Sequence, residues 1–242
     1  MSPVDLLLWG ALPYVAFAVF VVGSVWRYRH DKFGWTSRSS QLHESRLLRL
    51  GSPMFHYGLF MVLGGHVLGL LVPKELTELV GVTDSMYHVL SLVAGGVAGL
   101  AVVVGLGILL WRRWNTAAVR KATTPGDRIT FVVLALVVLA GMWVTGIDNG
   151  INGPYDYRAS VSPWVRSILL LQPEPGLMAG APLSYRMHAL LAFALFMLWP
   201  FSRLVHAFSA PLHYLFRPYI VYRSRTGDKI GTRAPDRGWE RV

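Results

Sequence analysis

Apolar residues in this chain gather in long runs that polar segments separate. A helix needs roughly 20 apolar residues to cross a hydrocarbon core of about 30 Å, and five runs meet or approach that length, at about residues 6–26, 51–73, 85–111, 129–147 and 183–208. The fifth run contains Arg186 near its start and Arg203 near its end, where long side chains reach the lipid headgroups. The pattern predicts an all-α membrane protein with a bundle of five transmembrane helices.

Composition supports this prediction. Hydrophobic residues make up 53% of the 242 residues and charged residues only 15%, whereas roughly a quarter of the residues in a soluble domain are charged. We see no internal repeat, so we predict a single membrane domain over residues 1–242, with a polar tail at about residues 209–242. The first run continues into WRYRHDK without a cleavage pattern, so we expect it to remain as the first helix.

The basic residues predict the orientation of the bundle. Of the 23 Lys and Arg residues, 19 lie between the first and second runs, between the third and fourth runs, or in the tail from Arg203. Lys and Arg concentrate in cytoplasmic segments of membrane proteins. We therefore expect a multi-pass protein of the cell membrane, with its N-terminus outside and its C-terminus in the cytoplasm. This orientation also accounts for the net charge of +10 without nucleic acid as a partner.

Histidines are the residues most suited to chemistry inside the bundle. The chain has no cysteine, which excludes disulfides, thiolate catalysis and cysteine-held metal clusters in this chain. Four of the eight histidines lie in the second and fifth runs, at His56, His66, His188 and His206. Titratable groups at membrane depth are costly and need a partner or a function.

The expected antiparallel course of these two helices pairs the four histidines. His56 should face His206 at the cytoplasmic side, and His66 should face His188 nearer the outside. Neutral imidazoles from two helices can clamp a haem between them, so the pairs predict two haem groups. The register is imperfect, because 10 residues on the second helix span about 15 Å and turn roughly 80° away from one face. For any single histidine, a hydrogen-bonded core role or a proton relay is an equal alternative.

Glycines are frequent on the second and third helices and permit two interpretations. They clear space for a cofactor, or they allow close helix packing of the small-xxx-small kind. The residues are Gly58, Gly64, Gly65, Gly69, Gly95, Gly96, Gly99, Gly105 and Gly107.

Several motifs together resemble a known family. They are RYR and SSQ in the first cytoplasmic loop, SPMFHYG and GGHVLGL in the second run, KATTPGD before the fourth, and RMHALLAFALFMLWPFSRLVHAFSAPLHYLFR in the fifth. With them, nearly the whole chain resembles the gamma subunit of respiratory nitrate reductase, a membrane di-haem cytochrome b. The resemblance implies two haem b groups, and that His66 and His188 hold the outer haem and His56 and His206 the inner haem.

The resemblance also implies an activity and partners. The chain would oxidise menaquinol or ubiquinol near the outer haem and release protons outside. It would pass electrons to an iron-sulfur beta subunit and then to a molybdenum-containing alpha subunit that reduces nitrate. The chain would anchor this complex in the membrane and serve anaerobic respiration.

Residues around the haems follow from the same interpretation. Members of the family place a lysine near the outer start of the third helix, whereas this sequence has DSMYHVLS there. We expect Gly65, Tyr87 and His88 to contact the quinol, with interfacial anchoring as the alternative for Tyr87. Haem propionates need cationic or hydrogen-bonding partners, and the candidates are Arg112, Arg203, Ser39 or Ser40 at the inner side and Arg186 at the outer side.

Two other functions are consistent with part of the sequence. The first is a related quinone-linked cytochrome b of another reductase, because a haem pair does not reveal the terminal acceptor. The second is a proton-coupled transporter with a histidine relay. The transporter is disfavoured because none of the five runs contains an Asp or Glu.

Overall fold

A computed structural model describes residues 2–31, 33–36 and 39–209 of the chain. The predicted tail from residue 210 lies outside the described residues. The described part is helical and contains no strand. Its α-helices are α1 (Pro3–Asp5), α2 (Leu12–His30), α3 (Arg46–His66), α4 (Lys74–Leu79), α5 (Asp84–Asn115), α6 (Ala117–Lys121), α7 (Pro125–Trp143), α8 (Val161–Leu169), α9 (Pro175–Ala179) and α10 (Leu183–Leu198).

Tighter and wider helical turns extend several of these helices. The π-helical segments are η1 (Leu6–Ala11), η2 (Val67–Leu71) and η3 (Val144–Ile151), and the 3-10 segments are η4 (Trp199–Phe201) and η5 (Arg203–Ser209). Isolated π-helical turns inside α-helices occur frequently at functional sites. Here η2 begins directly after His66.

Four continuous helices are long and apolar enough to cross a membrane, and a bent pair of helices can provide a fifth crossing. The four are Pro3–His30, Arg46–Leu71, Asp84–Asn115 and Pro125–Ile151, and the pair is Leu183–Phe201 with Arg203–Ser209. The prediction of an all-α, multi-pass membrane protein is therefore confirmed. The orientation stays a prediction. We use "inner end" for the end of the bundle where α2 and α5 finish, and "outer end" for the opposite end.

The helices extend beyond the runs from which they were predicted. The second run begins at residue 51, whereas α3 begins at Arg46, because backbone hydrogen bonds continue past the point where charged side chains begin. At the start of α7, the Thr124 side chain accepts from the backbone N–H of Asp127, and the Asp127 carboxylate accepts from the N–H of Thr124. This capping box starts the fourth crossing in the KATTPGD motif.

The fifth crossing is broken, which corrects the single helix expected over residues 183–208. Ser202 has an extended backbone, and the segments on its two sides meet at 76°. The cause is Pro200, which has no N–H to donate and whose ring clashes with the carbonyl one turn earlier. His188 therefore lies on α10, whereas His206 lies on the separate segment η5.

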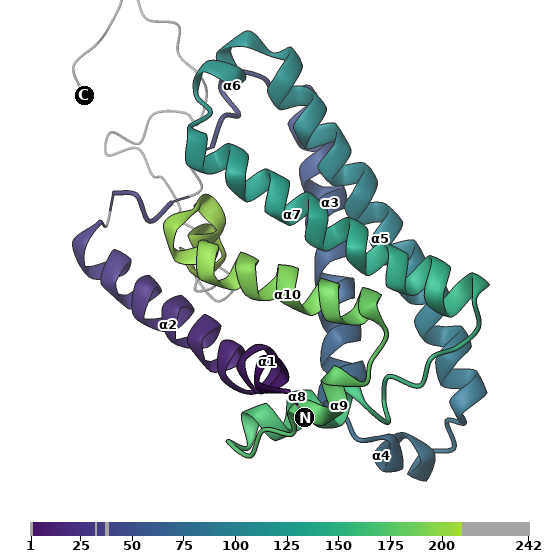
Figure 1. The fold of residues 1–242 in the computed structure, drawn as a ribbon. Coiled ribbons are helices and arrows are strands. Elements are labelled where there is room, and N and C mark those ends of the chain that lie inside the picture. Colours follow the sequence, from purple (N-terminus) through teal and green to yellow (C-terminus); the bar gives the residue numbers. More distant parts are fainter. Residues whose placement is uncertain (1, 32, 37–38, 210–242) are drawn as a thin grey trace, which may run out of the picture. The chain divides into compact units, whose positions relative to one another are not determined.

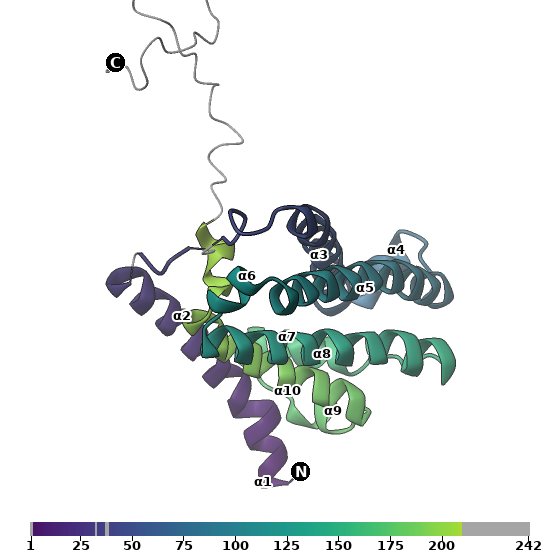
Figure 2. The same cartoon turned by 90° about the horizontal axis from the view of Figure 1, so that it is seen from above.

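The crossings pack in the spatial order α3, α5, α7, α10 and α2, as Figures 1 and 2 show. Glycines let α3 and α5 approach closely. A Cβ on Gly105 would lie 2.5 Å from the backbone nitrogen of Phe55, and one on Gly58 would lie 2.9 Å from the carbonyl oxygen of Ala98. By contrast, α10 packs against α7 and α2 rather than along α3.

The outer end is covered by a compact apolar cluster. Its centre is Trp9, Trp164 and Met178, which come from η1, α8 and α9 and are 4% exposed or less. The indole N–H of Trp164 donates to the carbonyl of Trp9 at 2.9 Å. The loop before the fifth crossing is thereby fixed against the first crossing.

Candidate functional site

The structure brings together the four predicted histidines in two pairs. The ring centroids of His56 and His206 lie 6.1 Å apart, near the inner end, with their planes at 76°. The ring centroids of His66 and His188 also lie 6.1 Å apart, toward the outer end, with their planes at 36°. Each pair joins α3 to the fifth crossing, although these two elements do not pack along each other.

Backbone carbonyls orient three of the four rings. The Nδ1 of His56 lies 2.7 Å from the carbonyl oxygen of Ser52, that of His66 lies 2.8 Å from Val62, and that of His206 lies 2.6 Å from Arg203. A carbonyl oxygen only accepts, so Nδ1 must be the protonated nitrogen in each neutral ring. The lone pair of Nε2 stays available, which is the usual arrangement for a histidine that binds a metal.

The spacing of the pairs fits a metal ion between the two rings. An imidazole nitrogen binds a first-row metal at about 2 Å, which places the centroids of two opposed rings roughly 6 Å apart. The observed 6.1 Å agrees with that span, whereas a direct hydrogen bond between the rings would bring them closer. The donor set of two neutral imidazoles is also that of a haem with two histidine ligands.

His188 is held differently from the other three. Its Nδ1 is buried and has no hydrogen-bond partner among the described residues. Its ring lies against Gly141 of α7, where an added Cβ would be 3.0 Å from the ring Cε1. Gly141 thus gives the His188 ring its space, a function that sequence reasoning did not assign.

Both interpretations of the glycines apply at different positions. Gly58 and Gly105 are close-packed, but a Cβ on Gly64 or Gly65 would meet nothing within 4 Å. The surface of α3 beside His66 is therefore open. Beside His56, a shallow hollow of about 410 Å³ is lined by Ser52, Pro53, Tyr57 and Phe60.

Three tyrosines, from α5, the outer loop and α10, lie close to the outer histidine pair in the chain or in contact with its neighbours. The hydroxyl of Tyr87 lies 3.2 Å from that of Tyr157, and both approach Gly69, one turn after His66. Tyr157 stacks on Tyr185, one turn before His188, with centroids 6.3 Å apart. Burial, aided by the hydrogen bond with Tyr87, raises the pKa of Tyr157 far above its usual range. Its hydroxyl therefore stays protonated.

Sequence reasoning identified Tyr87 but not Tyr157 or Arg158. The guanidinium of Arg158 lies over the Tyr87 ring at 4.1 Å, and Arg158 is 6% exposed. The signal in the sequence was the aromatic stretch NGPYDYR in the outer loop, but its place beside α5 depends on the tertiary fold. His88 is half-buried on the first turns of α5.

The predicted propionate partners divide into two groups. At the inner end, Arg112 donates to the side chain and carbonyl of Ser40 and to the carboxylate and carbonyl of Glu44, so it ties the loop between α2 and α3 to α5. Partial burial opposes ionisation of Glu44, but the Leu47 amide and Arg112 hold its pKa below its ordinary value. Most of the Arg112 donors are thus used within the chain. Ser39 accepts from the N–H of Gln41 in the same loop.

Arg203 and Arg186 lie closer to the histidine pairs along the chain. Arg203 donates to both carboxylate oxygens of Asp127 and to the carbonyl of Ala122, which joins η5 to the start of α7. Arg186 lies two residues before His188, and its Nε is buried without a hydrogen-bond partner among the described residues. An orphaned buried donor of this kind fits an anionic group that the described residues do not supply.

Comparisons with known proteins point to one family. The family model described as nitrate reductase gamma subunit matches residues 5–225. The nitrate reductase gamma chain of Bacillus subtilis is 43% identical, with 91% of this chain and 98% of that protein covered. The respiratory nitrate reductase 2 gamma chain of Escherichia coli is 30% identical, with coverage of 88% and 94%.

A longer protein is also similar to this chain. The nitrate reductase-like protein NarX of Mycobacterium tuberculosis is 50% identical over 96% of this chain. The chain spans only 36% of the length of that protein.

Proposed function

The chain belongs to the nitrate reductase gamma subunit family, and from this premise we propose that it is a quinol-oxidising di-haem cytochrome b. It would anchor a nitrate reductase in the membrane and carry electrons from quinol to the cytoplasmic subunits. One observation carries the proposal: two histidine pairs lie at different depths of one bundle, and the ring centroids of each pair are 6.1 Å apart. One pair alone would bind a cofactor, but two pairs provide a route across the membrane.

The four histidines would hold the haems, which supply reversible one-electron transfer. His66 and His188 would hold the outer haem, and His56 and His206 the inner haem. Carbonyls of the preceding turn hold Nδ1 of three rings, which leaves their Nε2 available to the haem iron. Gly141 gives the fourth ring its space. Arg186 would meet a propionate of the outer haem, and Arg203, which also holds Asp127, would meet one of the inner haem. Arg112, with Ser40, would hold the inner loop.

We propose that the quinol, menaquinol or ubiquinol, binds beside His66 at the outer end. The open surface at Gly65 leaves space for a flat ring, and the hydroxyls of Tyr87 and Tyr157 can hydrogen-bond to a quinol oxygen. His88 would accept a proton and release it at the outer side. Arg158, buried over the Tyr87 ring, adds positive charge where the family lysine is absent.

The partners follow from the family and from the inner end of the bundle. We propose that an iron-sulfur beta subunit contacts this end and passes electrons to a molybdenum-containing alpha subunit that reduces nitrate. The inner loop is fixed to α5 by Arg112 and Glu44, so it presents a defined surface rather than a loose segment. The single membrane domain predicted over residues 1–242 belongs to this proposal.

A visible spectrum of the purified chain or complex tests the proposal. We expect two b-type haems per chain, both reduced when a menaquinol or ubiquinol analogue is added without nitrate. Nitrate should then reoxidise them only when the partner subunits are present. A colourless protein from cells supplied with haem would contradict the proposal. Quinol-reducible haems that nitrate fails to reoxidise in the complex would assign the chain to a different reductase.

Gly141→Ala should disturb the outer haem alone. The new Cβ would lie 3.0 Å from the Cε1 of His188, so the ring or α7 must shift by a few tenths of an ångström. We expect a shifted midpoint potential and an altered low-spin spectrum for the outer haem, with the inner haem unchanged. Gly146→Ala is the matched control, because a Cβ there meets nothing within 4 Å. Equal effects of the two variants would refute this role for Gly141.

A further inference from the structure

The break in the fifth crossing interrupts the regular α-helical hydrogen bonds of the backbone. The regular helix α10 ends at Leu198, Pro200 lies in the 3-10 segment η4, and Ser202 is extended before η5 begins at Arg203, so carbonyls at the break lack the α-helical partner four residues further on. Unpaired carbonyls are costly in a low-dielectric environment. A side chain from another crossing must therefore stabilise this break.

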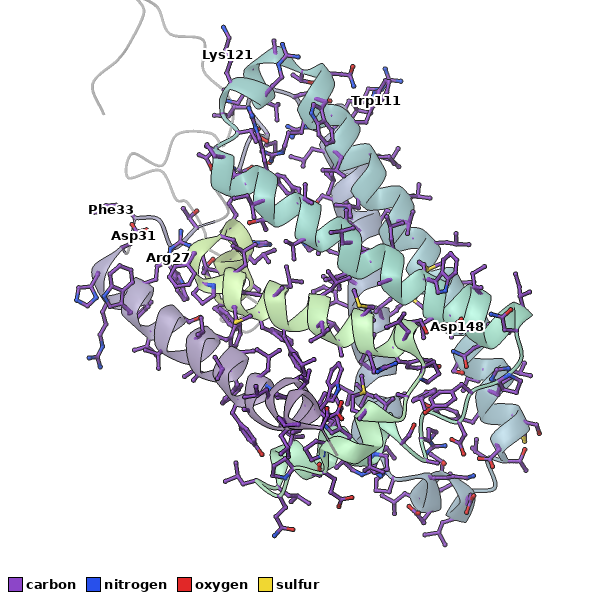
Figure 3. All side chains as sticks on the ribbon, viewed as in Figure 1. Arg27, Asp31, Phe33, Trp111, Lys121 and Asp148 are labelled. Atoms are coloured by element: carbon purple, nitrogen blue, oxygen red, sulfur yellow. The ribbon has the colours of Figure 1, made fainter. Side chains whose placement is uncertain are left out.

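Arg27, at the end of α2, supplies the missing donors. Its Nη1 donates to the carbonyl of Pro200 at 2.6 Å and to that of Ser202 at 2.7 Å. Figure 3 labels Arg27 and Asp31 near the end of α2. Its Nη2 donates to the carbonyl of Gly34 at 3.0 Å, and its Nε lies 3.4 Å from the Asp31 carboxylate. Arg27 is only 8% exposed.

The surroundings show that the first crossing is shaped around the break. A Cβ on Gly23 would lie 2.9 Å from the Cβ of Pro200, so α2 has a glycine where the proline ring packs. Asp31, one turn after Arg27, compensates the buried guanidinium charge. The planar guanidinium of arginine can donate to several carbonyls at once in a fixed geometry. The single ammonium group of lysine cannot reproduce this arrangement.

The break connects directly to a proposed haem ligand. Arg203 follows Ser202, and its carbonyl accepts from the Nδ1 of His206 at 2.6 Å. Arg27 thus holds the peptide next to the one that orients the His206 ring. The Arg203 side chain also fixes the start of η5, because it donates to both carboxylate oxygens of Asp127.

We propose that Arg27 is a positioning residue for the inner haem, acting through the broken helix on His206. This inference rests on the proposed function, because it concerns a ligand of that haem. Arg27 does not touch the haem in this scheme. It fixes the direction of the η5 backbone, and this backbone fixes the plane and height of the imidazole.

The test compares Arg27→Gln and Arg27→Lys with Arg29→Gln in the purified complex. Arg29 is exposed and lies two residues away on the same helix, so it matches the change in charge without the contacts. Removal of an outer-shell partner typically weakens metal binding about 10- to 100-fold. In both Arg27 variants we expect a loss of that order in the retention of the inner haem against a haem-scavenging apoglobin. The inner low-spin signal should shift as well, while the outer haem stays intact.

The outcomes separate this inference from the proposed function. If the unsubstituted protein contains two haems and Arg27→Gln leaves both signals and both retention rates unchanged, only the inference is overturned. Loss of both haems to the same extent would also overturn it, because it would reveal a general folding role. An unsubstituted protein without haem would overturn the proposed function and this inference together. Arg27→Lys provides the test if Arg27→Gln does not accumulate.

Discussion

His66→Ala is expected to remove the outer haem and to lower quinol-driven nitrate reduction by the complex more than about 100-fold, because loss of even an outer-shell partner typically costs 10- to 100-fold in metal affinity or activity. The inner haem should remain, since His56 and His206 lie at the other end of the bundle. Nitrate reduction with a soluble dye that donates directly to the cytoplasmic subunits should persist. Haem quantification, redox titration and the two activities measure these effects.

The reciprocal variant makes this prediction sharper. His56→Ala should remove the inner haem and leave an outer haem that quinol still reduces, but from which electrons no longer leave. The two pairs have interplanar angles of 76° and 36°, so their oxidised haems should also differ in their low-spin spectra. His43→Ala is the control, because His43 is exposed in the inner loop. Loss of the same haem in both His56→Ala and His66→Ala would show that the pairing is wrong.

The sequence alone predicted the bundle and the pairing of its histidines. Runs without formal charge locate the crossings, because charged groups are costly in the hydrocarbon core. Antiparallel helices then require the early histidine of α3 to face the late histidine of the fifth crossing. The structure brings those residues together, at equal centroid distances of 6.1 Å. The charge-free runs and the antiparallel course of the helices led to this pairing without knowledge of any side-chain contact.

Sequence reasoning failed where the tertiary structure decides. The sequence predicted an imperfect register between the two histidine pairs on continuous helices, whereas the structure shows a bend of 76° after Pro200, so that His206 lies on a separate segment. The proline was visible in the sequence, but a proline in a membrane helix can produce a kink as well as a break. In the structure, Arg27 from a distant crossing donates to the carbonyls of Pro200 and Ser202 at this break.

The loop residues illustrate a second limit. Tyr157 and Arg158 come from the turn-rich outer loop, which carries no periodic signal that would place it. Their position beside Tyr87 depends on contacts such as Trp164 with Trp9, between segments far apart in the chain. By contrast, Arg112 was predicted as a propionate partner from its place at a helix end, and its neighbours Ser40 and Glu44 became visible only in the fold.

Gly105→Ala is expected to weaken the whole bundle and to release the inner haem. The added Cβ would lie 2.5 Å from the backbone nitrogen of Phe55 and 2.8 Å from its Cα, so α3 would have to move as a unit. Overpacking of a tight interface lowers the free energy of unfolding by about 1–3 kcal/mol. The loss is larger when only backbone atoms can move to make space. His56 follows Phe55 directly, so this movement should change the distance from His56 to His206. Thermal unfolding in detergent and inner-haem content measure the two effects.

Gly107→Ala separates packing from helix propensity in this experiment. Residue 107 lies on the same helix, and a Cβ there meets nothing within 4 Å. Alanine in place of glycine in a helix interior is favourable by about 0.5–1 kcal/mol, so this variant should be neutral or slightly more stable. If both alanines stabilise the protein, α3 and α5 are not in close contact at this crossing. If Gly105→Ala destabilises the bundle yet leaves the inner haem unchanged, the position of His56 does not depend on this contact, and α3 must adjust between Phe55 and its neighbour.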